Sequence, residues 1–182
     1  SMILGDNFFY GQNLTQKLEK SLTHNSGARI FLKQVNNPEN FGVAKISKNI
    51  IESIVEKPKS FVSNYAVTGL YFFDNKVSKY AKTLKPSKRG EIEITDLLNI
   101  YKKNRILNFE HLGRGAIWSD AGKIGDMTNV SNFVKSVEEV QGIKIACLEE
   151  ISLFKKWINK KKITENIKFY GNCEYSNYLK KL

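Results

Sequence analysis

The chain has 182 residues, a hydrophobic fraction of 41% and a formal net charge of +11. This length suits one ordinary domain with its own core, and these fractions are typical of a globular protein. No apolar run in the sequence reaches the ~20 residues of a membrane-spanning helix, so we expect no membrane partner. The sequence does not open with a basic segment followed by an apolar core, and we therefore expect a cytoplasmic location.

The excess of basic residues has three interpretations: a nucleic-acid partner, an anionic ligand, or a general bias toward lysine, asparagine and isoleucine. The lysines are spread from Lys17 to Lys181 rather than gathered in one motif. We therefore expect no nucleic-acid partner. Cys147 and Cys173 lie far apart, which predicts ordinary thiols rather than a disulfide framework or a metal box.

The apolar pattern predicts a strand–helix–strand unit at the start of the chain. A short apolar run at residues 3–4 precedes a helix over 13–25, in which leucines recur every four residues on one face. An apolar strand over 28–35 follows. This order is typical of a parallel sheet.

The middle of the chain is rich in predicted strands. Strands near 43–46 and over 50–56 are separated by a short polar segment and are expected to form a hairpin. The strand over 64–73 is apolar on both faces, which places it at the centre of the sheet. Asp74 is expected to cap a helix over 75–84.

Helices and short strands complete the chain. We expect a helix over 95–103, strands over 105–112 and 116–118, the longest helix over 123–141, an extended piece over 143–147, and a helical region over 149–182. Together these elements predict an α/β fold, with a mixed sheet and flanking helices.

Two aspartates follow apolar runs in the same way. Asp6 comes after the first run and Asp120 after a later one, and ligands gather at the carboxyl ends of strands in open α/β sheets. Two carboxylates that meet across a sheet could hold one Mg²⁺ against a phosphate. A tight turn with a side-chain cap also explains Gly5-Asp6-Asn7, because these residue types favour turns.

A second group of residues has the chemistry to bind a phosphorylated ligand. Lys57 and Arg89 could neutralise phosphate oxygens, the arginine with a planar fork and the lysine as a point charge. Gly42 would let a ligand approach the backbone closely. A turn glycine and a surface ion pair are the structural alternatives.

A series of motifs in a fixed order points to one family. These motifs are Leu4-Gly5-Asp6-Asn7-Phe8-Phe9-Tyr10-Gly11, Asn36-Asn37-Pro38-Glu39-Asn40-Phe41-Gly42-Val43, Glu56-Lys57-Pro58, Ser63-Asn64-Tyr65-Ala66-Val67-Thr68-Gly69-Leu70-Tyr71, Arg89-Gly90-Glu91-Ile92-Glu93-Ile94-Thr95-Asp96, Gly113-Arg114-Gly115 and Trp118-Ser119-Asp120-Ala121-Gly122. Together they resemble the glucose-1-phosphate thymidylyltransferases, which are sugar-nucleotide pyrophosphorylases of the nucleotidyltransferase superfamily. The resemblance runs to about Trp157.

The resemblance implies a Rossmann-like nucleotide-diphospho-sugar transferase fold and a Mg²⁺-dependent reaction. In that reaction a phosphate oxygen of glucose 1-phosphate attacks the α-phosphate of dTTP, which yields dTDP-glucose and pyrophosphate. Carried over by position, Asp6 and Asp120 would bind the metal, and Lys57 and Arg89 would be the catalytic, phosphate-binding residues. The sugar site would be lined by Asn7, Gly42, Glu56 and Val67.

The sequence departs from the family in several respects, among them Ser119, Ala121 and Lys123 in the stretch around Asp120. It contains no glycine-rich loop of the kind that cradles the nucleotide, and Phe41 stands where the family usually has tyrosine. Residues 1–148 would therefore be the sugar-phosphate and metal portion of the domain, with a helical extension over 149–182. We expect the isolated chain to be inactive and either to form a homo-oligomer or to need a missing N-terminal half. The alternatives are a non-catalytic or split-enzyme subunit that self-associates, and a related nucleotidyltransferase that uses another sugar or nucleotide.

Overall fold

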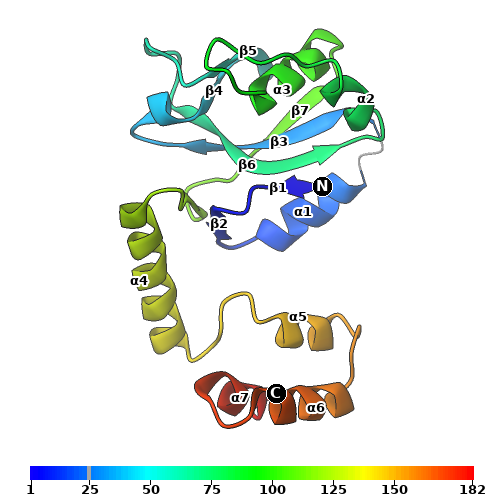
Figure 1. The fold of residues 1–182 in the computed structure, drawn as a ribbon, viewed down its shortest axis with the longest axis vertical. Helices are drawn as coiled ribbons and strands as arrows, with labels where there is room; N and C mark the ends of the chain where they lie inside the picture. The colour runs from blue at the N-terminus through cyan, green and yellow to red at the C-terminus, as the bar shows by residue number, and fades with distance from the viewer. Residues whose placement is uncertain (24–25) are drawn as a thin grey trace. The chain divides into compact units, whose positions relative to one another are not determined.

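The computed structural model describes residues 1–23 and 26–182, which fall into two units, 1–127 and 128–182 (Figure 1). The predicted boundary after residue 148 lies inside the second unit. Each unit has a hydrophobic core of its own.

The first unit is built on a mixed sheet with the strand order β5-β4-β6-β3-β7. The strands are β3 (Ala28–Gln34), β4 (Gly42–Ser47), β5 (Ile50–Glu56), β6 (Tyr65–Phe73) and β7 (Leu107–His111). β3 and β7 are parallel, whereas β4 pairs antiparallel with β5 and β6 pairs antiparallel with both β3 and β4. The predicted hairpin and the central position of β6 are confirmed.

The predicted strand–helix–strand unit is present, but its two strands are not neighbours. β1 (Met2–Ile3) pairs antiparallel with β6 opposite Tyr71 and Leu70, and β3 pairs antiparallel with the other edge of β6. β1 and β3 therefore run in the same direction with β6 between them. β4 pairs with β6 only near the start of β6, at Ala66. The later part of the same edge of β6 is therefore open to β1.

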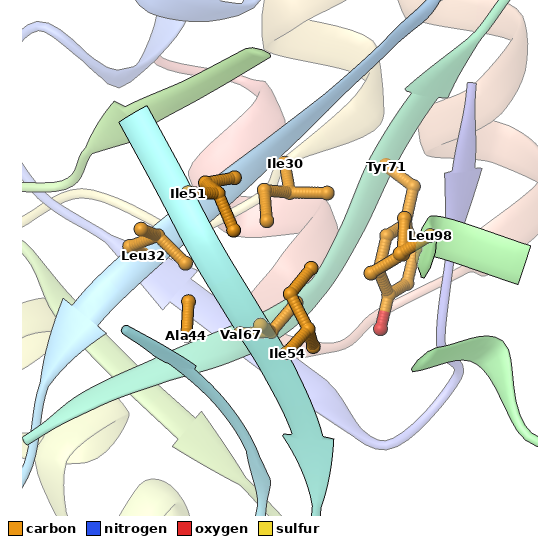
Figure 2. Packing of buried hydrophobic residues seen from close by; sticks show 8 residues of the cluster. All are labelled: Ile30, Leu32, Ala44, Ile51, Ile54, Val67, Tyr71 and Leu98. Atoms are coloured by element: carbon orange, nitrogen blue, oxygen red, sulfur yellow. The ribbon is translucent and has the colours of Figure 1, made fainter. Parts of the chain in front are cut away.

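Alternate side chains of the strands supply cores on the two faces of the sheet. On one face Ile30, Leu32, Val67 and Tyr71 pack with Leu98, which comes from α3 (Ile94–Lys103) (Figure 2). On the other face the core contains Phe31 and Leu70, against which α1 (Leu14–Leu22) packs through Leu14 and Leu18. Because strand side chains alternate between faces, one apolar strand contributes to both layers.

Two predicted helices differ from the structure at their ends. In the described residues α1 ends at Leu22, which is 64% exposed, and the last two predicted residues, His24 and Asn25, lie outside the described part. The helix predicted over 75–84 is the shorter α2 (Val77–Ala81), and Asp74 does not cap it. The Asp74 carboxylate instead accepts hydrogen bonds from the backbone of Gly27 and Lys76 and from the Tyr101 hydroxyl.

A separate two-stranded ribbon carries the predicted metal ligands. β2 (Asn7–Tyr10) and β8 (Ile117–Asp120) are antiparallel, with Asn7 opposite Asp120. A short 3-10 helix, η1 (Pro38–Asn40), leads into β4.

The second unit is helical. α4 (Ile124–Gln141) begins at the end of the first unit, and α5 (Leu148–Phe154), α6 (Lys160–Tyr170) and α7 (Glu174–Leu179) follow. Residues 143–147, predicted to be extended, form a loop in which Ala146 has a left-handed backbone. The core of the unit is formed by Cys147, Ile163, Tyr178 and Leu179.

No helix in the described part of the chain is long and apolar enough to span a membrane.

Candidate functional site

The ribbon of β2 and β8 brings Asp6 and Asp120 together. Asp6 immediately precedes β2, and its carbonyl accepts a hydrogen bond of 2.7 Å from the backbone N–H of Ala121, which extends the ladder beyond Asp120. A Cβ atom on Gly122 would lie 3.0 Å from Oδ1 of Asp120 and 3.3 Å from Oδ2 of Asp6. The two carboxylates therefore flank a space that any side chain at position 122 would enter.

This donor set fits a hard divalent cation. Two carboxylates with an open space between them suit Mg²⁺, which usually takes one or two carboxylates and completes its shell with water and phosphate oxygens. Within the described residues no cluster of three or more histidine, cysteine or carboxylate side chains is arranged to hold a metal. The site therefore differs from a closed structural metal site.

A small pocket of about 180 Å³ lies beside the carboxylate pair. Its walls include five of the six residues predicted to bind the sugar phosphate, namely Asn7, Gly42, Glu56, Lys57 and Val67. Asp120 also lines it. A larger cleft of about 810 Å³ contains Asp6 and shares Phe41, Lys57, Trp118 and Asp120 with the small pocket, so the two hollows share walls.

Gly42 is required by close packing at the floor of the small pocket. A Cβ atom at this position would lie 2.8 Å from Cγ2 of Thr95 and 3.2 Å from Oε2 of Glu56. Real Cβ atoms do not approach other heavy atoms as closely as 2.8 Å. The missing side chain thus lets β4 pass close to Glu56 and α3.

Glu56, the last residue of β5, has a perturbed carboxyl group. Burial raises its pKa, and the negative charge of Glu93 raises it further. A hydrogen bond from Thr95 and the positive charges of Lys57 and Arg89 act in the opposite direction. A partly desolvated carboxylate of this kind is suited to accept hydrogen bonds from the hydroxyl groups of a sugar.

Arg89 does not line the small pocket but contacts one of its walls. Its guanidinium lies 3.3 Å from Glu93, 3.0 Å from Glu91 and 3.7 Å from Glu56. Glu93 is only 8% exposed and also accepts a hydrogen bond from the Ser87 hydroxyl at 2.8 Å. In this structure Arg89 therefore neutralises a group of carboxylates.

Lys57 stands where the two hollows meet. It follows β5 in a left-handed backbone conformation, with φ at 39°, and its backbone N–H donates to the carbonyl of Phe41 at 3.0 Å. A non-glycine residue with positive φ is uncommon, and such residues concentrate at functional sites. Lys57 lines both hollows.

The structure adds residues that the sequence did not assign. Trp118 lies two positions before Asp120 on β8 and therefore on the same face of the ribbon. Its ring lies 4.9 Å from that of Phe41, centroid to centroid, and both line the two hollows. Because every second residue of a strand shares a face, the spacing between Trp118 and Asp120 was the sequence signal that would have identified Trp118. Thr95 and Glu93 had no comparable signal, because they reach Glu56 through tertiary packing.

Comparison with known proteins identifies the family. Residues 1–137 match the family described as "Nucleotidyl transferase". The chain is 43% identical over 182 residues to the glucose-1-phosphate thymidylyltransferase of Neisseria meningitidis serogroup A. This match covers all of the present chain and 63% of the relative. It is 37% identical over 183 residues to the enzyme of the same name from Mycobacterium tuberculosis, with the same coverage. The chain thus spans less than two thirds of the length of these relatives.

Solved structures show the same fold. A putative glucose-1-phosphate thymidylyltransferase from Bacillus anthracis, crystallised with sucrose, superposes on this chain with a TM-score of 0.64 at 42% identity. The superposition covers 72% of this chain and 52% of the Bacillus anthracis chain. A UDP-glucose pyrophosphorylase complexed with UDP-glucose gives a TM-score of 0.62 at 22% identity, with 74% and 55% covered, and supports the fold alone. The predicted α/β class, with a mixed sheet and flanking helices, is confirmed. By the match over residues 1–137, this chain belongs to the nucleotidyl transferase family.

Proposed function

We propose that this chain carries the sugar-phosphate and cation side of a glucose-1-phosphate thymidylyltransferase. The observation that supports this most directly is the small pocket with Glu56 in its wall, which shares Asp120 and Lys57 with the cleft that contains Asp6. A sugar and its phosphate need these neighbouring environments, one that accepts hydrogen bonds from hydroxyl groups and one that neutralises negative charge.

The proposed reaction transfers a nucleotidyl group. An oxygen of glucose 1-phosphate forms a bond to the α-phosphorus of dTTP, the bond from that phosphorus to the bridging oxygen breaks, and pyrophosphate leaves. Mg²⁺ bound by Asp6 and Asp120 would neutralise the charge on the phosphates. Phosphoryl-type transfer depends on positioning and charge neutralisation far more than on covalent chemistry, so the task of this chain's residues is to hold the attacking group in place.

Four residues of the pocket have a role in this proposal. Glu56 accepts hydrogen bonds from the sugar hydroxyls, Gly42 and Val67 shape the wall, and Lys57 holds the phosphate as a point charge. Arg89 is the second proposed phosphate ligand, and its guanidinium has N–H donors beyond those that face the carboxylates. The choice of dTTP and glucose follows from the relatives' names, and a related nucleotidyltransferase with another sugar or nucleotide is the alternative. A reaction that consumes a nucleoside triphosphate also fits the proposed cytoplasmic location.

Calorimetric titration of the 182-residue chain with glucose 1-phosphate and Mn²⁺ tests this proposal. We expect binding that Lys57→Met weakens about tenfold, because a charged hydrogen bond contributes roughly 1.5–3 kcal/mol. Lys59→Met is the matched control, because Lys59 lies two residues away and outside both hollows. Equal effects of the two substitutions, or no binding to the unsubstituted chain, would overturn the proposal.

A pyrophosphate-release assay addresses the activity of the chain by itself. With dTTP, glucose 1-phosphate and Mg²⁺ we expect no turnover, because the 182 residues contain no glycine-rich loop to hold the triphosphate. Turnover at an ordinary enzymatic rate would show that other residues of the chain bind the nucleotide. A panel of other sugar phosphates in the titration distinguishes the alternative substrates.

Self-association is a second candidate property, favoured by exposed apolar residues at β1. Met2, Ile3 and Leu4 are 37%, 57% and 40% exposed. Contiguous apolar side chains on an exposed strand promote association between chains. Light scattering across a range of concentrations should show oligomers, and a monomer at the highest concentration would count against this property.

A further inference from the structure

Asn7 lies at the junction between the carboxylate pair and the small pocket. Its Oδ1 accepts a hydrogen bond of 2.6 Å from Nε1 of Trp118 and one of 2.9 Å from the backbone N–H of Gly69. Its Nδ2 donates to Oδ1 of Asp6 at 3.0 Å. An amide oxygen has two lone pairs, and both are used here. The orientation of the amide follows from this pattern, with its N–H directed at Asp6.

The amide of Asn7 rests directly on the central strand. A Cβ atom on Gly69, in the middle of β6, would lie 2.6 Å from Oδ1 of Asn7. The backbone of the sheet therefore supplies both the donor and the space that Asn7 needs. This contact ties the ribbon of β2 and β8 to the six-stranded sheet.

Trp118 depends on the same amide. The indole N–H is the only polar group of tryptophan, and Asn7 accepts it. The ring of Trp118 forms part of the wall of both hollows and contacts Phe41. Loss of the Asn7 oxygen would leave this ring without the bond that fixes its orientation.

Asp6 is held by one of its two oxygens. Oδ1 receives the N–H of Asn7, and Oδ2 lies toward Gly122, on the side where Oδ1 of Asp120 also lies. A carboxylate fixed through one oxygen presents the other in a defined direction. Hydrogen bonds of this kind orient metal ligands and raise the affinity of the site.

We propose that Asn7 is a positioning residue that couples the cation site to the sugar pocket through its hydrogen bonds to Asp6 and Trp118. This inference rests on the proposed function, because it takes Asp6 and Asp120 as the cation ligands. It adds to the role implied by the family resemblance, in which Asn7 lines the sugar site: the amide oxygen is used by Trp118 and Gly69, and one N–H of the amide is used by Asp6. Coupling through one amide is reciprocal, so a ligand that orders Trp118 and a cation at Asp6 raise each other's affinity by the same factor.

Binding of Mn²⁺ to the 182-residue chain, followed by electron paramagnetic resonance of the free ion, tests the inference without any activity. We expect Asn7→Ala and Trp118→Phe each to weaken Mn²⁺ binding by about tenfold, the lower end of the effect of losing a hydrogen-bond partner behind a metal ligand. Trp118→Phe is informative because it keeps an aromatic ring but removes the N–H. The matched control is Phe61→Leu, which changes an aromatic ring that is 76% exposed and lies outside both hollows, and we expect Mn²⁺ binding to be unchanged.

Two further variants separate the failure of this inference from the failure of the proposed function. Asp6→Asn and Asp120→Asn should abolish Mn²⁺ binding; if they do not, the proposed cation site is wrong and the inference falls with it. If they do, and Trp118→Phe binds Mn²⁺ as tightly as Phe61→Leu does, the positioning role of Asn7 alone is overturned. Thermal unfolding of each variant shows whether it is folded, and Trp118→Phe provides the measurement if Asn7→Ala does not fold.

Discussion

At the scale of single residues, Glu56 in the pocket is suited to ligand binding but lowers the stability of the folded chain when it is ionised. Folding raises its pKa, so the folded chain holds this proton more tightly than the unfolded chain does. The contribution of Glu56 to the free energy of unfolding is then most favourable below its ordinary pKa of 4.5 and falls as the pH rises through the higher folded value. Once it is ionised, the partly buried carboxylate is a net cost.

We therefore expect Glu56→Gln to raise the thermal midpoint at pH 7 and to lose this advantage below pH 4.5. Thermal unfolding followed by circular dichroism at both pH values measures the difference. Glu52→Gln, on the same strand, is the control: hydrogen bonds from Lys45 and Ser47 lower the pKa of Glu52, so its substitution should not raise the midpoint at pH 7. A lower thermal midpoint for Glu56→Gln at pH 7 would contradict this account. Weaker binding of glucose 1-phosphate by the Glu56→Gln variant would agree with the proposed function.

Of two glycines near the site, one is expected to lose stability when it is replaced by alanine and the other is not. Gly69→Ala places a Cβ atom 2.6 Å from the Asn7 side chain inside the sheet, whereas nothing lies within 4 Å of a Cβ atom on Gly5. Overpacking of this kind costs about 1–3 kcal/mol. Chemical denaturation should show that loss for Gly69→Ala and almost none for Gly5→Ala, and similar losses for both would refute the packing argument.

The sequence predicted Asp6, Asp120 and the five pocket residues through motifs, and all of these residues except Val67, which lies within β6, sit at a strand end or in a turn. It did not predict the ion pairs of Arg89, because they depend on how the segment before α3 folds back over β5. The same limit applies to Asn7. Its place beside Asp6 was expected, but the partners of its amide oxygen come from β6 and β8, which are far away in the sequence.

At the scale of elements, Asp74 connects three segments. Its carboxylate accepts a bond of 2.9 Å from Gly27 before β3, one of 3.0 Å from Lys76 before α2 and one of 2.9 Å from the Tyr101 hydroxyl on α3. Burial would raise the pKa of Asp74, but these hydrogen bonds outweigh it and the pKa is lowered. The stability that Asp74 provides is thus present above the unfolded pKa and is lost as the pH falls through the lower folded value.

We expect Asp74→Asn to destabilise the chain by about 1–2 kcal/mol at pH 7, because its NH₂ group would face a donor. The deficit should shrink in acid, as the carboxylate of the unsubstituted chain is protonated. Urea titrations at pH 7 and pH 3 provide the comparison, with the exposed Asp96 as the control through Asp96→Asn. A deficit that stays constant down to pH 3 would show that the charge of Asp74 is not involved.

Elements with local signals were predicted well, and pairings between distant segments were not. The double-sided apolar pattern of β6, the hairpin of β4 and β5, and the length of α4 are all present in the structure. The insertion of β6 between β1 and β3 depends on how far β4 extends along one edge of β6, which no local pattern encodes. The Asp74 contacts are of the same kind, since a residue suited to cap a helix is used to join three elements.

At the scale of the whole molecule, the two units rest on different interactions. The first is an apolar sheet covered on both faces, whereas the second combines a smaller core with a buried carboxylate. Glu149 is 7% exposed and accepts hydrogen bonds from Tyr175 at 2.5 Å, from Tyr170 at 2.8 Å and from Asn166 at 3.3 Å. These bonds join the start of α5 to α6 and α7.

We expect Glu149→Ala to destabilise the second unit while the first keeps its structure. The substitution leaves three donors without their acceptor, at about 1–3 kcal/mol for each buried group that stays unpaired. Hydrogen exchange followed by mass spectrometry should then show faster exchange in α5, α6 and α7, with unchanged protection in β3 and β6. Glu165→Gln, at an exposed position of α6, is the control and should leave both units unchanged. Faster exchange in β3 and β6 as well would mean that the units unfold together, and the binding site on the first unit would then depend on the helices of the second.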